Sequence, residues 1–438
     1  MKLRRLFLSL LIVSLSPRSF STTNPPPSEI LTKKEAFALL KHDGLKWKLT
    51  ETLALEANGK TLQENSETAL KYELISKEII VRSNPAIYGL ESKLDSDLIT
   101  VGTTGLAFSY GLYDPASQLK LQGSIAHEGI VRNQVQQFQQ DLTAALLVQY
   151  ATVQKLERQK AELKNGEARA GTVLKLAEMK SRVGAGVKSE LAKAKILIEA
   201  EYLKRLTNEV KLTKATQELM RFIGVRGKTF SLEDMTPADV LISETESSDL
   251  SSALRQRLDH RSAKATAEAA DEAIQKLSKK FWPKVSVVGD IGSTDTTFAG
   301  LPGRRLSGLV AINLSIPLES GGLIEGKRAE MLALKNRATI GLQQSEMDLE
   351  DQVKQSRQQM TAARIAETAS SHYVESVQSE MNIAQKKFSA GSASSMDLLT
   401  ANAALAAALD TETEAIFNLE LAKIQYFKAK GSFEGYFK

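Results

Sequence analysis

The stretch FSAGSASSMDLLTA at residues 388–401 separates two long helical patterns and decides how the chain folds. Lys386 and Lys387 precede it, and cations suit the last turn of a helix because they face the negative end of its dipole. Gly391 can adopt the left-handed conformation that follows a helix end. Ser394 can then cap a new helix, with Asp397 three residues later completing a capping box. The stretch therefore predicts a tight turn between two antiparallel helices.

A second stretch, RVGAGVKSELAKA at 182–194, has the same small and polar character about half a chain earlier. Upstream of the two stretches, LAFSYGLYDP at 106–115 aligns with INLSIPLESG at 312–321. So long a period indicates duplication of a domain-sized unit rather than a solenoid of short repeats. The positions that correspond are Gly186 and Gly391, Ser189 and Ser394, and the helix-ending Gly224 and Gly431.

The repeat suggests a division of the 438 residues into four parts. Residues 1–21 have a basic start and an apolar stretch too short to span a membrane, which is typical of a secretory signal peptide. Residues 22–53 form an N-terminal extension with no counterpart in the repeat. The first repeat occupies 54–230, with a helix, a β-hairpin at 85–112 and a long helical hairpin whose tip lies near 183–189. The second occupies 231–438, with a β-hairpin at 283–318 and a tip near 389–395.

The strand segments alternate between apolar residues and small or polar ones. In the last of them Val310, Ile312, Leu314 and Ile316 alternate with Ala311, Asn313 and Ser315. Half-buried strands of a soluble sheet give the same pattern. Two observations favour a channel wall with a wet lumen and a lipid-facing exterior: charges recur on one face of IYGLESKLD at 87–95, and no second sheet is available for packing. The residues expected to line the lumen are Glu91, Lys93, Asp95, Asn313 and Ser315, a solvated loop being the alternative for the first three.

Four strands are too few to close a barrel, because outer-membrane barrels begin at about eight strands. If these strands form a barrel, several chains must share it.

The helical segments carry a heptad-like pattern, which argues for coiled-coil packing. Residues 325–388, as one continuous helix, would reach about 95 Å at 1.5 Å per residue. A rod of this length suits a conduit or a strut better than a globular domain. The seam positions are Leu342, Leu349, Val353, Met360, Ala363, Val374, Val377, Met381, Ala384 and Phe388, with Ser356 and Ser370 in step, and an earlier run holds Val131, Val135, Phe138, Leu142 and Ala145.

Signals for enzymatic chemistry are weak. The chain has no cysteine, which excludes disulfides and thiolate metal sites. His42, His127, His260 and His372 have no metal-ligand spacing and are expected at the surface. The two GKT triplets, at 59–61 and 227–229, lack the preceding glycine of a P-loop. We therefore expect no catalytic residues, no metal, no cofactor and no enzyme. The net charge of +5 falls to +1 without the four basic residues of the leader, so it gives no reason to expect nucleic acid.

Several segments together resemble the TolC-type outer-membrane efflux proteins, also called outer membrane factors. AGSASSMDLLTA at 390–401 is similar to the family's turn, with glycine, serine, aspartate, leucine and alanine at fixed spacing. RLDHRSAKATAEAADEAIQKLSKKFWPKVSV at 257–287 resembles its helix leading through a proline into a strand, and INLSIPLESGG at 312–322 its second strand hairpin. The resemblance covers roughly 54–431. The first copy departs from the pattern, because Glu190 substitutes only in part for the aspartate.

The resemblance implies a mainly α fold with a small β part: long coiled-coil hairpins and two β-hairpins per chain, assembling as a trimeric channel tunnel. Three chains would share one twelve-stranded barrel in the cell outer membrane, continued by helices across the periplasm. A mixed region near mid-length would come from about 225–256 and the chain ends. The implied partners are the homotrimer itself, outer-membrane lipid, a periplasmic membrane-fusion adaptor and an inner-membrane transporter of the RND, ABC or MFS type.

The resemblance also assigns roles to the two tips. Asp397, with Ser394 and Gly391, would lie at the narrow end of the tunnel, where three carboxylates around an axis attract cations and help to gate the pore. A plain capping role for Asp397 is the alternative, and both roles can coexist. Gly186, Ser189 and Glu190 would contact the adaptor, although turn formation alone can explain the glycine.

The sequence therefore predicts a passive exit duct for small molecules or polypeptides in a tripartite efflux or type I secretion system. A soluble periplasmic coiled-coil adaptor is the main alternative, and it predicts no lipid-facing strands. A filament-forming coiled coil is disfavoured by the strands and the glycine turns. Nothing in the sequence identifies the cargo.

Overall fold

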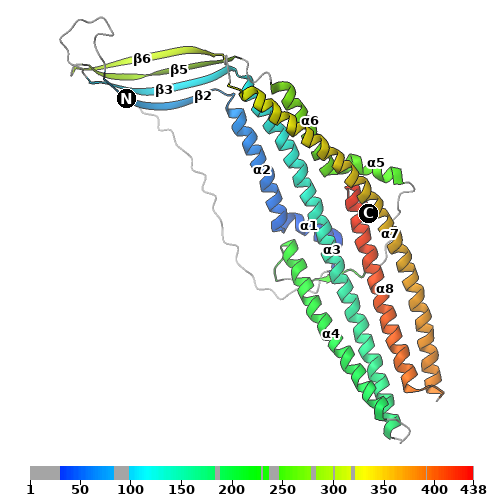
Figure 1. Cartoon of the computed structure of the whole chain (residues 1–438). Coiled ribbons are helices and arrows are strands. Elements are labelled where there is room, and N and C mark those ends of the chain that lie inside the picture. Colours follow the sequence, from blue (N-terminus) through cyan, green and yellow to red (C-terminus); the bar gives the residue numbers. More distant parts are fainter. Residues whose placement is uncertain are drawn as a thin grey trace.

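The computed structural model describes residues 30–82, 98–182, 188–227, 230–235, 246–277, 283–298, 301–316, 321–390 and 392–437. The molecule is elongated, with a curved sheet at one end and long helices running away from it (Figure 1). The fold is mainly helical with a small β part, as the sequence predicts.

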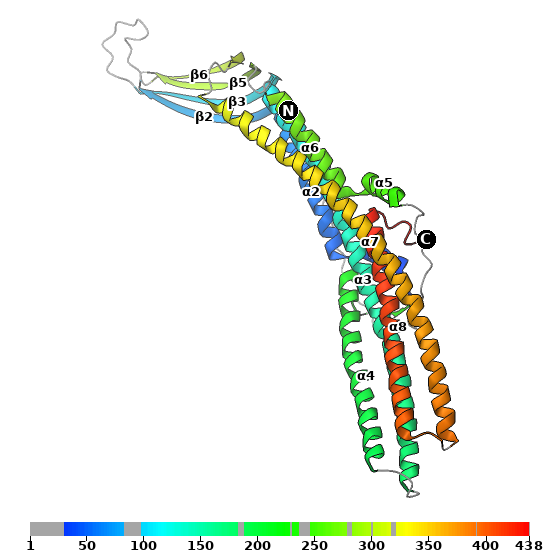
Figure 2. The same cartoon turned by 45° about the vertical axis from the view of Figure 1, so that its right-hand side comes forward.

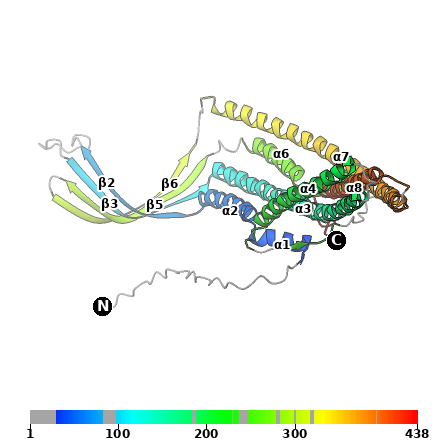
Figure 3. The same cartoon turned by 90° about the horizontal axis from the view of Figure 1, so that it is seen from below.

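The main sheet has four antiparallel strands in the order β2-β3-β5-β6. They are β2 (Lys71–Arg82), β3 (Leu98–Tyr113), β5 (Lys284–Phe298) and β6 (Leu301–Ser315). Neighbouring strands pair along most of their length, and β3 pairs with β5, so the sheet joins the two halves of the chain. Viewed from below, the strands curve strongly (Figure 3).

The first strand pair differs from the expected range of 85–112, because β2 begins at Lys71. Its sequence, KYELISKEIIVR, mixes charged residues with apolar ones, and lysine and glutamate are depleted in strands. Pairing of the whole of β2 with β3 outweighs this weak local preference. The segment at 87–95, expected to be a strand, lies outside the described residues.

Two helical hairpins make up most of the remaining length. The first consists of α3 (Pro115–Arg182) and α4 (Lys188–Ile223), and the second of α7 (Leu323–Ser389) and α8 (Ser395–Lys430). The 67 residues of α7 form one continuous helix, about 100 Å long at 1.5 Å per residue. Helix α3 packs on both α4 and α8, and α8 packs on α7, so α4 and α7 are the outer helices of the group (Figure 2).

The predicted seam of α7 is buried. Leu349, Val353 and Met360 are at most 1% exposed, and Val377, Met381 and Phe388 are also buried. Ser356 and Ser370 are buried in step with them, which lets the neighbouring helices approach closely. The earlier run on α3 is only partly correct: Phe138 is 52% exposed, because the buried face of α3 passes through Leu146, Tyr150 and Val153 instead.

The segment that begins at Ile30, the segment between the halves and the C-terminal residues meet near the middle of the long axis (Figure 1). Here lie β1 (Ile30–Leu31), α1 (Lys33–Asp43), β4 (Ser231–Leu232) and α5 (Glu246–Gln256). Above them α2 (Leu45–Ser66) and α6 (Leu258–Leu277) run toward the sheet. A capping box between Thr32 and Glu35 starts α1, and β1 pairs in parallel with β4.

The N-terminal extension is thus part of the folded body. Ala36 and Leu40 of α1 are fully buried in a cluster with Leu146 of α3 and with Leu219 and Ile223 of α4. Its expected boundary at residue 53 falls inside α2, which begins at Leu45. Sequence analysis did not predict how this segment packs, because its partners are helices more than a hundred residues away in the chain.

Candidate functional site: an amphipathic sheet, helical tips and a mid-length network

One face of the sheet is apolar and uncovered in the single chain. The register places Tyr72, Phe108, Gly289 and Val310 in one cross-strand row, because directly paired residues share a face. The next row holds Leu74, Leu106 and Ile291. These side chains are large and exposed: Leu74 is 77% exposed, Ile291 64% and Val310 69%. The large exposed apolar residues on this face are Tyr72, Leu74, Ile80, Leu106, Tyr110, Tyr113, Ile291, Leu306, Val310, Ile312 and Leu314.

Gly289 allows two strands to pack closely on this face. A Cβ built at residue 289 would lie 2.5 Å from the ring of Phe108, closer than real side chains approach. The missing side chain therefore lets the Phe108 ring lie across β5.

The apolar band has a definite height. On β6 it runs from Leu306 to Leu314, a span of about 26 Å at roughly 3.3 Å per residue. Beyond its far end, on the same face, Arg304 and Asp295 form an ion pair at 3.6 Å. An apolar band of about 25 Å bounded by polar groups has the dimensions of a lipid-facing surface.

The opposite face of the sheet carries mostly small and polar side chains. Asn313 pairs with Ser286, and Ser315 pairs with Lys284, on this face. Leu309, 57% exposed, is an apolar exception. Asn313 and Ser315, two of the residues expected at the lumen, thus lie on the polar side. The other three, Glu91, Lys93 and Asp95, lie outside the described residues.

The tip of the α7–α8 hairpin is built as the sequence predicts. Lys386 and Lys387 occupy the last turn of α7. Ser394 caps α8: the Asp397 backbone N–H donates to Ser394 Oγ at 3.2 Å, and the Ser394 backbone N–H donates to Asp397 Oδ2 at 2.8 Å. The backbone and hydroxyl hydrogen bonds from Ser394 lower the pKa of Asp397. Asp397 is an exposed carboxylate at the end of the molecule, while Gly391 lies outside the described residues.

The other tip departs from the expected pattern. Helix α4 begins at Lys188, so Ser189 is a helical residue and not the cap. Glu190 lies in the first turn, where a carboxylate favours the helix dipole. Gly186 lies outside the described residues. The helices end alike, because Gly224 follows α4 with a φ of 84° and Gly431 follows α8 with a φ of 79°, a left-handed conformation suited to glycine.

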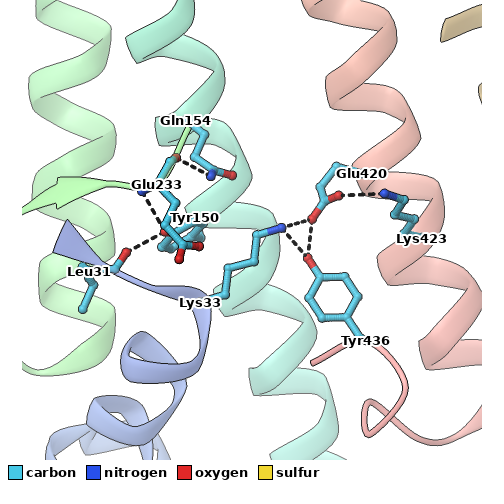
Figure 4. A network of polar contacts seen from close by, with 8 residues as sticks. All are labelled: Leu31, Lys33, Tyr150, Gln154, Glu233, Glu420, Lys423 and Tyr436. Carbon is cyan, nitrogen blue, oxygen red and sulfur yellow. Dashed lines mark hydrogen bonds and ion pairs between the residues drawn. The ribbon is translucent and has the colours of Figure 1, made fainter. Parts of the chain in front are cut away.

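A polar network near mid-length ties the chain ends to the helices, and sequence analysis missed it (Figure 4). Lys33 of α1 forms an ion pair with Glu420 of α8, and Lys423 lies 3.6 Å from the same carboxylate. The Tyr436 hydroxyl donates to Glu420 and accepts from Lys33 at 3.2 Å. Burial alone would raise the pKa of Glu420, but the two ammonium groups and the tyrosine hydroxyl hold it below its usual value.

Tyr150 organises the neighbouring backbone (Figure 4). Its hydroxyl donates to the Leu31 carbonyl at 2.6 Å and accepts from the Glu233 N–H at 3.3 Å. One side chain of α3 therefore holds β1 and β4 together. Burial raises the pKa of the Tyr150 hydroxyl, so it remains a donor.

A second buried cluster centres on Asp249 of α5, which is 0% exposed. Its carboxylate accepts from Arg357 of α7 at 2.9 Å, from the Tyr426 hydroxyl at 2.9 Å, and pairs with Lys430 at 2.9 Å. This cluster fixes α5 to both helices of the second hairpin. The one sequence signal for such clusters is a charged residue inside an apolar helical run, such as Glu420 and Lys423 in FNLELAKIQYF.

The histidine prediction is wrong for one residue. His42, His127 and His372 are exposed, but His260 is 8% exposed because α6 packs its side against α7, where Nε2 lies 3.4 Å from Glu346. Within the described residues, no group of three or more His, Asp or Glu side chains is placed to hold a metal ion. The described helices also lack any stretch long and apolar enough to cross a bilayer.

The sequence of the second half resembles a known family. Residues 250–431 match the family described as outer membrane efflux protein. The match covers α5 to α8, including the apolar strands β5 and β6 and the capped tip at Ser394. No curated protein sequence matches the chain.

Solved structures share the fold of this chain at low sequence identity. A membrane protein from Pseudomonas aeruginosa aligns with a TM-score of 0.79 at 15% identity, covering 96% of this chain and 97% of that one. The outer membrane protein VceC of Vibrio cholerae aligns with a TM-score of 0.76 at 15% identity, over 92% and 97% of the two chains. The CmeC outer membrane channel of Campylobacter jejuni gives 0.74 at 15% identity, over 94% and 90%. These structural alignments show that the chain shares the fold of these proteins.

Proposed function

We propose that this protein is the outer-membrane channel of a tripartite efflux or type I secretion system, a passive exit duct across the periplasm and outer membrane. The observation that carries the proposal is the uncovered apolar face of the sheet. Most of its leucine, isoleucine, valine and tyrosine side chains, on β2, β3, β5 and β6, are 36–87% exposed. A contiguous apolar surface of this kind is unfavourable in water and marks a membrane or protein interface.

The strand number supports a shared barrel. A four-stranded sheet is too small to close, and β2 and β6 are its two edges. In lipid, unpaired edge groups have no water to satisfy them, so a membrane-spanning sheet must close on itself. Three copies joined edge to edge would give a twelve-stranded barrel, within the range of outer-membrane barrels. The polar face with Asn313 and Ser315 would then line the lumen.

The helices would continue the conduit through the periplasm. A helix of about 100 Å has the reach for this task. At its end, the exposed Asp397 carboxylate of each copy would form a ring around the axis, attracting cations and narrowing the pore. Ser394 holds that carboxylate in place, and the proposal assigns Gly391, which lies outside the described residues, to the same tip. In the same proposal Gly186, Ser189 and Glu190 at the other tip contact a periplasmic membrane-fusion adaptor, which couples the channel to an inner-membrane transporter.

Comparison with solved structures supports this proposal at the level of fold. One of the similar structures, CmeC, is described as an outer membrane channel. The family model that matches residues 250–431 is named for efflux across the outer membrane.

A soluble periplasmic adaptor is the competing function. Such a protein would turn the apolar face of its sheet inward, onto a second sheet or a helix. Among the described elements none covers that face, so the channel is favoured.

Two measurements test the proposal. Membrane fractionation should find the protein in the outer membrane, released by detergent as a particle of three chains. Purified protein in planar bilayers should give discrete conductance steps. A monomer that stays in the aqueous fraction without detergent would favour the adaptor and overturn the channel.

A further inference from the structure

The polar face of the sheet carries its charges in rows. Directly paired residues share a face of a sheet, so the register that defines the apolar rows also defines rows on the opposite face. One of these rows crosses all four strands and holds two carboxylates, one on β2 and one on β5. From β2 to β6 its members are Glu73, Ala107, Asp290 and Leu309.

A second row on the same face holds two cations. It lies four residues further from the helices, and from β2 to β6 its members are Lys77, Thr103, Thr294 and Arg305. Four residues at about 3.3 Å each separate the two rows by about 13 Å. Lys77 and Arg305 lie on the two edge strands of the sheet.

The level between the two rows is uncharged. Its members are Ile75, Gly105, Gly292 and Ser307. A Cβ built at residue 105 would lie 2.4 Å from the Cα of Gly292, so β3 and β5 approach each other too closely there to carry side chains. At this level, therefore, no side chain of the two central strands stands between the carboxylates and the cations.

The four charged side chains of the two rows have no partner of opposite sign within the part of the chain that the structure describes. Three of them are exposed, and Asp290 is half-buried. The adjacent charges on the apolar face differ, because Arg304 pairs there with Asp295 at 3.6 Å. The charges on the polar face are thus free to act on ions and solutes.

Two more lysines lie on the polar face, nearer the helices. Lys71, one row below the carboxylates, adds one cation per chain. Lys284 pairs with Asp114 at 2.5 Å and adds no net charge. The described strands therefore carry more positive than negative charge on this face, and the row of cations holds most of it.

We infer that the exit through the outer membrane carries two rings of opposite charge, and that the ring of Lys77 and Arg305 sets its preference among ions. The inference rests on the proposed function, because it takes the polar face as the lumen and three copies as the wall. Two charges per row in each of three copies give six charges per ring. Because β2 follows α2 and β6 leads toward α7, the carboxylate ring lies nearer the periplasm and the cationic ring nearer the cell exterior.

The rings are strong enough to act across the lumen. Twelve strands about 4.8 Å apart and tilted by about 40° enclose a wall of about 12 Å radius. Charges are screened over about 10 Å at about 0.1 M salt but over about 3 Å at about 1 M. By Coulomb's law in water, six charges at about 12 Å, opposed in part by the second ring about 13 Å away, change the concentration of each small ion on the axis about twofold at about 0.1 M salt. At about 1 M salt the effect is negligible.

The order of the rings makes the exit asymmetric. Cations gather at the carboxylate ring and anions at the cationic ring. A voltage that is positive on the periplasmic side drives both kinds of ion into the space between the rings, whereas the opposite voltage drains that space. The current at about 0.1 M salt should therefore be larger with the periplasmic side positive. A solute with a net charge of either sign meets one ring that repels it, so solutes without net charge are the class that both rings admit.

Two neighbouring arginines provide a matched comparison in planar bilayers. Arg305 lies on the polar face and Arg304 on the apolar face, one residue apart on β6. Under a gradient of about 0.1 M against about 0.01 M potassium chloride, where screening is weak, Arg305→Gln together with Lys77→Gln should raise the potassium-to-chloride permeability ratio about twofold or more. Arg304→Gln should leave that ratio unchanged. Glu73→Gln with Asp290→Asn should lower it, and these differences should vanish at about 1 M salt.

Thiol labelling of the folded channel gives a second readout, which does not depend on how each charge variant assembles. The chain has no cysteine of its own. A positively charged thiosulfonate reagent should return Arg305→Cys to the wild-type permeability ratio, and a negatively charged one should move the ratio further toward potassium. The same labels on Arg304→Cys, which faces lipid, should leave the ratio unchanged.

The results separate this inference from the function on which it rests. Discrete conductance steps whose permeability ratio responds to Arg304 as much as to Arg305, or to neither row of charges, overturn the two rings and leave the channel standing. A shift opposite in sign to the expected one overturns them as well. A protein that stays in the aqueous fraction and gives no conductance removes the channel itself, and the rings with it.

Discussion

A positive charge at the middle of the apolar band should separate a lipid-facing wall from an ordinary sheet. Val310 lies midway between Leu306 and Leu314 and is 69% exposed. In a soluble sheet, Val310→Arg on an exposed site would change stability by only a few tenths of a kcal/mol. In a bilayer, an arginine near the midplane of a barrel wall costs about 2–4 kcal/mol per chain. For three copies that act independently the loss would be about 6–12 kcal/mol per trimer.

The neighbouring residue supplies a matched control. Leu309 is also a large aliphatic residue and is 57% exposed, but it lies on the polar face opposite Asp290. Leu309→Arg should therefore be close to neutral. Each variant is refolded into lipid vesicles and unfolded with denaturant, and the trimer in the outer membrane is measured alongside. The reasoning fails if Leu309→Arg costs as much as Val310→Arg, or if Val310→Arg is neutral.

Four further predictions concern the helical part. Removing the buried carboxylate with Asp249→Ala leaves Arg357 and Lys430 without their shared partner and should cost about 3–5 kcal/mol of unfolding free energy; an unchanged melting temperature would contradict this. Tyr150→Phe removes a hydrogen-bond donor to Leu31 and an acceptor for Glu233, and should lower the unfolding free energy by about 1–3 kcal/mol. Amide exchange should become faster mainly at β1 and β4. If protection at these two strands is unchanged, the hydroxyl is dispensable. At the tip, the hydrogen bonds from Ser394 lower the pKa of Asp397 in the folded protein. The cap therefore contributes its full stability above pH 3.8, the ordinary pKa of an aspartate. That stability is lost as the pH falls through the lower pKa of the folded state, because the carboxylate becomes protonated. Amide exchange in the first turn of α8 should show that dependence, and Ser394→Ala should abolish it. In the assembled channel, Asp397→Ala should raise conductance and weaken block by divalent cations; recordings unchanged in both respects would leave Asp397 with a capping role only.

Local signals in the sequence were sufficient for the long helices and one of the tips. The heptad pattern of α7 places Leu349, Val353 and Met360 in the buried seam, because every third or fourth residue of a helix shares a face. The capping box of Ser394 and Asp397 involves residues three apart, so it needs no distant partner. The alternation on β6 likewise identified its apolar and polar faces before any pairing was known.

The same local signals failed where a partner lay far along the chain. Strand β2 has a composition unfavourable for a strand, and its pairing with β3 makes it one. Ser189 resembles a cap, yet α4 starts one residue earlier. The network of Lys33, Glu420 and Tyr436 joins residues nearly four hundred positions apart, so no spacing in the sequence could suggest it.

The sequence by itself determined the elements and their faces: two helical hairpins, alternating strands, a capped turn and a duplicated unit. These follow from interactions within a few residues, which the order of side chains specifies directly. Only the tertiary structure decided that β3 pairs with β5, that the segment after Ile30 meets the C-terminal residues at mid-length, and that one side of the sheet and the outer sides of α4 and α7 are left uncovered. Such features depend on which surfaces are still exposed after all contacts within the chain have formed. They are therefore a property of the whole folded chain.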